Sequence, residues 1–323
     1  TAREHAEELL TVAQNLQNSS FLLEAHLALG EILFWLGDLS AALEHVKQGS
    51  ALYSPQEHRW QDFLYVQDPG MACCGYEAWT LWFLGYPDEA IKKSDEAMTL
   101  AQEQSHPYSI AIAHVFSSWL RQFLRESKLS QELADKLIEL SAEHRFPQWL
   151  ALGNIMRGWA LIDQGREGDG IEDVRDGIAA RRVRGSEVAL TYFLALLAES
   201  YGKVGQAEEG IAVLTEALDT AQKTGECFYQ AELYRLKGEL LLLLSQENNN
   251  EAEGCFRQAM DIARRQGAKS LELRATISLS RLLKSKGKKY EAQQMLAEIY
   301  NWFTEGFDTK DLKEAKALLE ELS

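Results

Sequence analysis

The sequence predicts an all-α protein that folds as a curved α-solenoid, an array of helical hairpins stacked side by side. Residues that favour helices dominate, and β-branched residues never alternate with polar ones over a useful length. Apolar residues recur at helical spacing along most of the chain, and this pattern breaks at nearly regular intervals. Hydrophobic residues make up 46% of the chain, enough for a continuous core, and only 5 prolines argue against long disordered segments.

The stretch 187–225 defines the repeating unit. Leu194, Leu197, Ala198 and Tyr201 recur at i, i+3, i+4 and i+7, which is typical of an amphipathic helix. Gly205 follows in the break, where it can adopt the left-handed conformation that ends a helix. The second helix carries its stripe at Gly210, Leu214, Ala217, Leu218 and Ala221. Because the connecting turn is short, the two helices must lie antiparallel, with the small residues Ala198, Gly210 and Ala217 at their closest approach.

This hairpin resembles the tetratricopeptide repeat. Leu197, Ala198, Tyr201, Gly205 and Ala217 fall at the spacing of that family, while Gly210 stands where the family usually has alanine. The resemblance implies a superhelix in which the first helix of each repeat lines the inner wall. The repeats here are longer than the family's standard unit of about 34 residues.

Seven such hairpins are expected in order along the chain, between a leading helix over 2–16 and a capping helix over 311–322. Their approximate ranges are 22–53, 68–102, 107–141, 149–180, 187–225, 229–265 and 271–302. The turns are expected at positions 37, 85, 127, 165, 205, 245 and 287, so successive turns lie 38 to 48 residues apart. Ser127 replaces the turn glycine of the third repeat, and the turn from Ser245 to Asn250 is longer than the others.

The whole chain, 1–323, is expected to form a single superhelical domain. Residues 1–21 hold the leading helix, 22–302 the seven repeats and 303–323 the capping helix. An aromatic-rich connector, Ser54 to Val66, joins the first two repeats and is longer than a usual turn, which fits either a functional segment or packing over a repeat edge. The chain begins within a helical pattern and without methionine, so we expect a fragment of a longer protein or a processed one.

Charge and cysteine content exclude several classes of partner. The net charge of -16 disfavours binding to nucleic acid or to an anionic membrane. The 4 cysteines show neither CxxC spacing nor nearby histidine ligands, so no metal site is expected, and buried free thiols in a reducing compartment are the simplest interpretation. With no signal peptide and no membrane-spanning apolar run, a cytoplasmic location is predicted.

The sequence offers no catalytic or cofactor-binding motif. HExxH and GxSxG are absent, and the glycine-rich run 165–170 lacks both the preceding strand and the Gly-Lys-Ser/Thr ending of a phosphate loop. We therefore expect no enzyme activity and no cofactor. Two basic runs fit a solvated face with cations at helix C-termini, or docking onto an acidic partner domain: Arg175, Arg181, Arg182 and Arg184, and Lys284, Lys286, Lys288 and Lys289.

Aligning the repeats on their turns predicts which residues face the concave surface. The candidate residues for binding a ligand or partner are Trp79, Trp82, Phe83, His114, Arg121, Trp159, Tyr192, Glu199, Arg235 and Glu239. The same alignment points Arg125, Glu232, Arg274 and Arg281 inward. The amino-terminal half of the wall is thus aromatic and the carboxy-terminal half carries mixed charge. Exposed tryptophan and arginine dominate binding hot spots, but closely packed long helices would instead make the tryptophans core.

A second resemblance rests on longer runs of sequence. QDPG at 67–70, WTLWFLGYPD at 79–88, HP at 106–107, GWA at 158–160 and AELYRLKGEL at 231–240 are similar to runs in large bacterial signalling proteins. In that family a class III adenylate or guanylate cyclase, or a DNA-binding domain, precedes a regulatory P-loop ATPase and a tetratricopeptide region. In the related maltose-regulon activator, the helical-repeat domain binds the inducer and relieves inhibition of the ATPase. The resemblance implies that this chain is a sensor arm.

Together these observations predict a non-enzymatic regulatory module that recognises a protein or peptide on its concave face, with neighbouring domains of the same polypeptide as possible partners. The alternative is a sensor for a small anionic or aromatic effector, and a helical enzyme is a third hypothesis. An open groove would favour the first, and an enclosed aromatic pocket the second.

Overall fold

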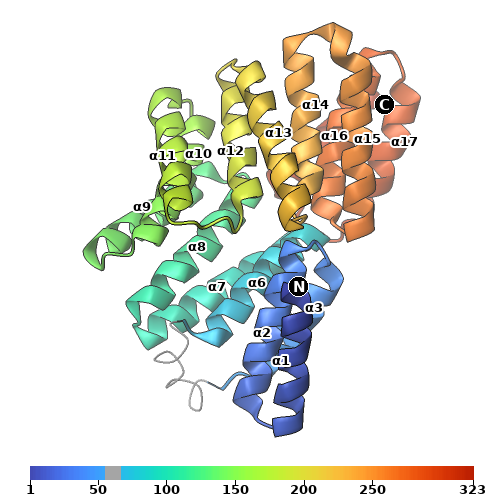
Figure 1. The fold of residues 1–323 in the computed structure, drawn as a ribbon. Helices are drawn as coiled ribbons and strands as arrows, with labels where there is room; N and C mark the ends of the chain where they lie inside the picture. The colour runs from blue at the N-terminus through green and yellow to red at the C-terminus, as the bar shows by residue number, and fades with distance from the viewer. Residues whose placement is uncertain (55–66) are drawn as a thin grey trace.

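The computed structural model describes residues 1–54 and 67–323, and it confirms the predicted helical-repeat solenoid (Figure 1). Over these two ranges, seven antiparallel hairpins follow one another after α1 (Ala2–Leu16), and α18 (Lys310–Leu322) closes the C-terminal end. No strand occurs in the described ranges. The hairpins are α2–α3 (Ser19–Trp35, Leu39–Leu52), α6–α7 (Pro69–Leu84, Pro87–Gln104), α8–α9 (Pro107–Phe123, Ser127–Glu143), α10–α11 (Pro147–Asp163, Glu167–Val183), α12–α13 (Leu190–Lys203, Ala207–Thr224), α14–α15 (Gln230–Leu244, Asn249–Gln266) and α16–α17 (Lys269–Ser285, Lys289–Tyr300).

The helix starts follow from local chemistry. Four of the described helices begin with proline, whose missing N–H needs no partner in the first turn: α6, α7, α8 and α10. Asp68 caps α6 by accepting the backbone N–H of Met71 at 2.6 Å. Of the predicted connector Ser54–Val66, residues 55–66 lie outside the described part of the chain.

The turns of five hairpins follow one rule, and those of the third and sixth repeats depart from it. Gly37, Gly85, Gly165, Gly205 and Gly287 all have positive φ, and each stands two residues before the next helix. In the third repeat Arg125, with φ of 61°, holds this position, and Ser127 is already the first residue of α9. The prediction of Ser127 as the turn residue was therefore wrong by two positions. In the sixth repeat, Ser245 is extended and a short 3₁₀ helix, Gln246–Asn248, leads into α15.

Small residues lie where the two helices of a hairpin approach most closely. Ala198 and Ala217 have no exposed surface. A Cβ atom added at Gly210 would lie 3.1 Å from the Ala198 carbonyl oxygen and 2.8 Å from a methyl group of Leu240. The spacing between α12 and α13 is therefore set by side-chain size.

Ala198→Leu is expected to destabilise the protein by about 1–3 kcal/mol, because the larger side chain overpacks this contact. Thermal unfolding followed by circular dichroism measures the effect. The matched control is Ala212→Leu, on the exposed face of α13 in the same hairpin, with an expected change within about 0.5 kcal/mol. Equal melting temperatures for the two variants would contradict the assigned packing face.

The superhelix is wound so tightly that early and late repeats touch. The backbone N–H of Cys227 donates to the Trp35 carbonyl at 2.8 Å, and the Ser270 hydroxyl donates to the Trp82 carbonyl at 2.5 Å. The backbone N–H of Gly306 donates to the Asp88 carboxylate at 3.0 Å. In Figure 1 the N-terminal hairpins, in blue, accordingly lie directly below the C-terminal ones, in orange.

The inner space of the superhelix is filled by aromatic side chains from the first helices of successive repeats. The rings of Trp79 and Trp119 stack with centroids 4.6 Å apart and an angle of 7° between their planes. Phe34 of α2 meets Phe228, just before α14, at 5.1 Å, although 194 residues separate them in sequence (228 − 34). Most of the amino-terminal part of the concave wall is therefore a packed core.

Candidate functional site

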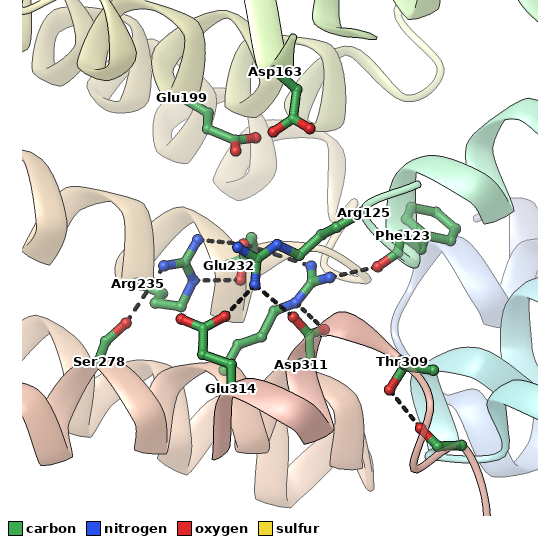
Figure 2. Close-up of polar contacts among 12 residues, drawn as sticks. Phe123, Arg125, Asp163, Glu199, Glu232, Arg235, Ser278, Thr309, Asp311 and Glu314 are labelled. Atoms are coloured by element: carbon green, nitrogen blue, oxygen red, sulfur yellow. Dashed lines mark hydrogen bonds and ion pairs between the residues drawn. The ribbon is translucent and has the colours of Figure 1, made fainter. Parts of the chain in front are cut away.

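A charged cavity of about 340 Å³ opens in the carboxy-terminal half of the concave side, among α10, α12, α14, α16 and α18. Trp159, Leu236, Leu240, Leu243 and Ile277 contribute apolar surface. The remaining lining is mostly ionisable: Arg125, Asp163, Glu199, Lys203, Glu232, Arg235, Glu239, Arg274, Arg281, Asp311 and Glu314. Figure 2 shows Asp163 and Glu199 on one wall, facing Arg125 and Arg235 across the cavity.

The sequence-predicted residues divide among three places. Trp159, Glu199, Arg235 and Glu239 line the charged cavity, as do the other inward residues Arg125, Glu232, Arg274 and Arg281. Trp79 lines a second cavity in the amino-terminal half. Trp82, Phe83, His114, Arg121 and Tyr192 line neither cavity.

Burial explains why four of those five residues are not on an open wall, and the fifth, Arg121, is held in an ion pair. Trp82, Phe83 and Tyr192 are at most 2% exposed, and the Tyr192 hydroxyl donates to the side-chain oxygen of Gln122 at 2.8 Å. His114 is 9% exposed, and Arg121 pairs with Glu126 at 2.8 Å. The alignment placed the aromatic residues on the inner side correctly, but the tight winding brings opposite walls into contact. Whether any of the ten residues binds a partner stays a prediction.

Arg274 forms the floor of the charged cavity. Its Nε donates to Asp311 of α18 at 2.7 Å, and one Nη donates to the backbone carbonyl of Phe123 at the end of α8. Its guanidinium lies 4.9 Å from the ring centroid of Trp82, within cation–π range. One side chain of α16 thus holds together three elements that are distant in sequence.

Arg235 and Glu232 form a forked ion pair on α14. The Nε and one Nη of Arg235 donate to the two carboxylate oxygens of Glu232 at 2.9 and 2.7 Å. The other Nη lies 3.4 Å from both Glu239 and the Ser278 hydroxyl, which itself donates to Glu239 at 2.5 Å. These contacts fix the orientation of the Arg235 guanidinium at the wall of the cavity.

The opposite wall carries negative charge around one lysine. Lys203 of α12 donates to Asp163 at 2.8 Å and pairs with Glu199 at 3.2 Å. The indole N–H of Trp159 donates to Glu199 at 3.1 Å. Burial opposes ionisation of Glu199, but the charges of Lys203 and Arg235 and the indole hydrogen bond outweigh it, so its pKa lies below the ordinary value.

The capping helix supplies the last two carboxylates. Arg125 donates to Asp311 at 2.9 Å and to Glu314 at 2.6 Å, and Arg281 also donates to Glu314. Burial opposes the charge on both carboxylates, but Arg125, with Arg274 at Asp311 and Arg281 at Glu314, lowers the pKa of each. The left-handed backbone at Arg125, which costs roughly 1–2 kcal/mol for a residue with a Cβ, is held by these ion pairs.

This arrangement suits recognition. Asp163, Glu199, Asp311 and Glu314 all have pKa values held below the ordinary range, against opposing burial, so their charges are fixed at neutral pH. Asp163, Lys203, Asp311 and Glu314 were not among the predicted residues. The i, i+4 spacing of Glu199 and Lys203 could have identified Lys203 from the sequence. Asp311 and Glu314 could not be found in this way, because α18 lies outside the repeat register.

The structure also locates the cysteines and tests for metal-ligand clusters and membrane-spanning helices. Cys73, Cys74 and Cys255 are buried free thiols, as predicted, whereas Cys227 is partly exposed. Within the described ranges, no three His, Cys, Asp or Glu side chains gather as metal ligands. In the same part of the chain, none of the helices has both the length and the apolar character needed to cross a membrane.

Comparison with known protein sequences finds a distant relative. No family model matches the chain. An uncharacterized protein of Rhizobium meliloti (strain 1021) is 24% identical over 288 residues, which cover 86% of this chain and 27% of that protein. The chain thus spans about a quarter of the length of this curated relative.

Solved structures with similar folds have low sequence identity to the chain. A Rap protein complexed with Competence and Sporulation Factor has a TM-score of 0.64 at 16% identity, covering 82% of this chain and 70% of that one. NprR in complex with its cognate peptide NprX has a TM-score of 0.58 at 13% identity, covering 90% and 82%. Aspartyl phosphate phosphatase F from Bacillus subtilis has a TM-score of 0.54 at 12% identity, covering 90% and 73%. The chain therefore has a tetratricopeptide-like repeat fold.

Proposed function

We propose that this chain is a non-enzymatic recognition module that binds a peptide or protein segment in the charged cavity. The observation that carries the proposal is the convergence of fixed charges of both signs around one cavity, supplied by four inner helices and the capping helix. A peptide carries charges of both signs at its termini and side chains, which such a surface can match. NprR, a fold neighbour, was crystallised with its cognate peptide, which supports this class of ligand.

The residues that contact the partner lie at the rim of the cavity. The side chains of Arg281 and Glu239 are 53% and 38% exposed, whereas those of Arg274 and Glu232 are at most 7% exposed. Buried pairs shape the cavity, and exposed charges steer and discriminate the partner. Specific binding therefore depends on Arg281 and Glu239 more than on the floor.

We further propose that residues 1–323 act as one superhelical domain, the sensor arm of a larger signalling ATPase fused to a cyclase or a DNA-binding domain. The hydrogen bonds between early and late repeats favour a single unit. The runs WTLWFLGYPD and AELYRLKGEL and the much greater length of the bacterial relative support a larger protein. A neighbouring domain of the same polypeptide would then be the partner.

Screening immobilised heptapeptides that carry both acidic and basic residues tests peptide recognition, with affinities measured by fluorescence polarisation. Arg281→Gln is expected to weaken the selected peptides by about threefold to tenfold, the range for a partly exposed charge pair. The matched control is Arg182→Gln, which removes a similarly exposed arginine from its pair with Glu216. Finding no binder, or finding binders insensitive to Arg281→Gln, would refute recognition at this cavity.

A further inference from the structure

A second cavity of about 260 Å³ lies in the amino-terminal half, among α2, α6, α8, α10 and the segment that joins α11 to α12. It shares no lining residue with the charged cavity. Its walls are largely aromatic: Trp35, Tyr76, Trp79, Phe116, Trp119 and Phe193. Such a cavity differs in chemistry from the charged one and requires a different ligand.

Arg181 of α11 is the cation that lines this cavity in the described part of the chain. The sequence pattern placed it in a solvated basic run, and this was wrong, because Arg181 is only 5% exposed. One Nη donates to the Ser186 hydroxyl and to the Val188 carbonyl, both at 2.9 Å, and the guanidinium lies 5.1 Å from the Phe193 ring centroid. The other Nη has no hydrogen-bond partner among residues 1–54 and 67–323.

Among the described residues, the charge of Arg181 is compensated only in part, by a carboxylate beyond ion-pair distance. No carboxylate of the described residues lies within ion-pair distance of it, and the carboxylate of Glu226 is already engaged by the Ala189 N–H and the Thr191 hydroxyl. Burial lowers the pKa of Arg181 to about 10, with a partial offset from the more distant Glu226, so the side chain is still charged at pH 7. A buried, unpaired charge is costly, and an anion bound in the cavity would remove that cost.

Two indole N–H groups at the same cavity also lack an acceptor in the part of the chain that the structure describes. They belong to Trp119 and Trp149. By contrast, Glu31, a carboxylate of the same lining, accepts the Tyr76 hydroxyl at 2.7 Å and the Trp35 indole at 3.4 Å. Buried unsatisfied donors are uncommon in folded proteins, yet one cavity gathers three of them and each needs an acceptor.

We propose that this cavity binds a small carboxylate with an apolar, preferably aromatic, body. The free Nη of Arg181 and the two indole N–H groups supply donors for the carboxylate, and the ring walls enclose the body. The volume lies just below the range of about 300–1,000 Å³ typical of ligand pockets, which limits the body to a single ring system. The proposal is independent of peptide binding in the charged cavity, because the two sites share no residue and either can fail alone.

Isothermal titration calorimetry with phenylacetate, indole-3-acetate and 4-methylpentanoate tests the proposal, with phenylacetamide and indole-3-acetamide as uncharged analogues. The acids are expected to bind and the amides to bind at least about tenfold more weakly, since a charge-assisted hydrogen bond is lost. Arg181→Met should weaken the acids by about tenfold or more for the same reason. Trp149→Phe, which keeps a ring and removes one donor, should weaken them by about threefold.

Arg182→Met is the matched control, because it removes the neighbouring arginine, which is exposed and pairs with Glu216 away from the cavity. Its affinity should match that of the parent. If circular dichroism shows that Arg181→Met does not fold, the proposal is tested by Trp149→Phe and by the ratio of acid to amide affinities of the parent protein. The proposal is overturned if no acid binds at millimolar concentration, if amides bind equally, or if only a peptide ending in a free Leu-Phe carboxylate binds.

Discussion

Replacing Trp82 with alanine is expected to lower the free energy of unfolding by about 3–5 kcal/mol, the range for a buried aromatic side chain. Trp82 is 2% exposed. Its ring stacks on Phe123 at 4.9 Å, meets Phe83 edge-on at 4.9 Å and lies under the guanidinium of Arg274. The cavity left behind cannot close easily, because the neighbouring groups belong to three different helices.

Denaturant unfolding followed by circular dichroism measures this loss. Tyr290→Ala, which truncates a ring that is 72% exposed on α17, is the control and should shift stability by no more than about 0.5 kcal/mol. If Trp82 lined an open binding wall, as its place among the sequence-predicted candidates implies, Trp82→Ala would instead weaken binding and leave the fold helical. Parental stability combined with lost peptide binding would support that earlier interpretation and contradict the core assignment.

The sequence predicted the repeats and their inner face because both depend on local order. Helical spacing locates the stripes, and the turn glycines locate the ends of first helices. Even the division of the inner wall into an aromatic half and a charged half could be read from the alignment. Arg125 lines the charged cavity, but its place as the turn residue of the third repeat was missed, because nothing in its side chain marks a left-handed backbone.

The winding of the superhelix could not be predicted, because it depends on contacts between residues that are far apart in sequence. Phe34 and Phe228 meet only because small rotations between successive repeats accumulate. An inward aromatic residue therefore fits a groove and a core equally well, until it is known whether early and late repeats of the superhelix touch. The same limit applies to Asp311, whose helix caps the stack outside the repeat register, and to Arg181, which is buried while Arg182 beside it is exposed.

Arg274→Met is expected to destabilise the protein by about 3–5 kcal/mol, because it breaks a buried ion pair and leaves the carboxylate of Asp311 with Arg125 but without its shorter ion pair. The side chains of Arg274 and Asp311 are 7% and 11% exposed. The Phe123 carbonyl also loses its donor, which loosens the contact between α8 and α16. Arg157→Met, which breaks a partly exposed pair with Asp173, is the control and should cost about 1 kcal/mol or less.

The acid dependence of stability separates the lost ion pair from lost packing. Burial alone would raise the pKa of Asp311, but Arg274 and Arg125 lower it below the ordinary value. A carboxylate whose folded pKa is depressed contributes stability above its unfolded pKa, about 3.9, and this contribution is lost as the pH falls through the folded value. In Arg274→Met the pKa of Asp311 should rise, so the variant should differ from the parent more at pH 7 than at pH 3. Adding Asp311→Leu should recover part of the loss at pH 7, since the buried carboxylate is then removed and Arg125 still pairs with Glu314. A deficit that is equal at both pH values and unchanged in the double variant would mean that Arg274 closes the superhelix by packing alone.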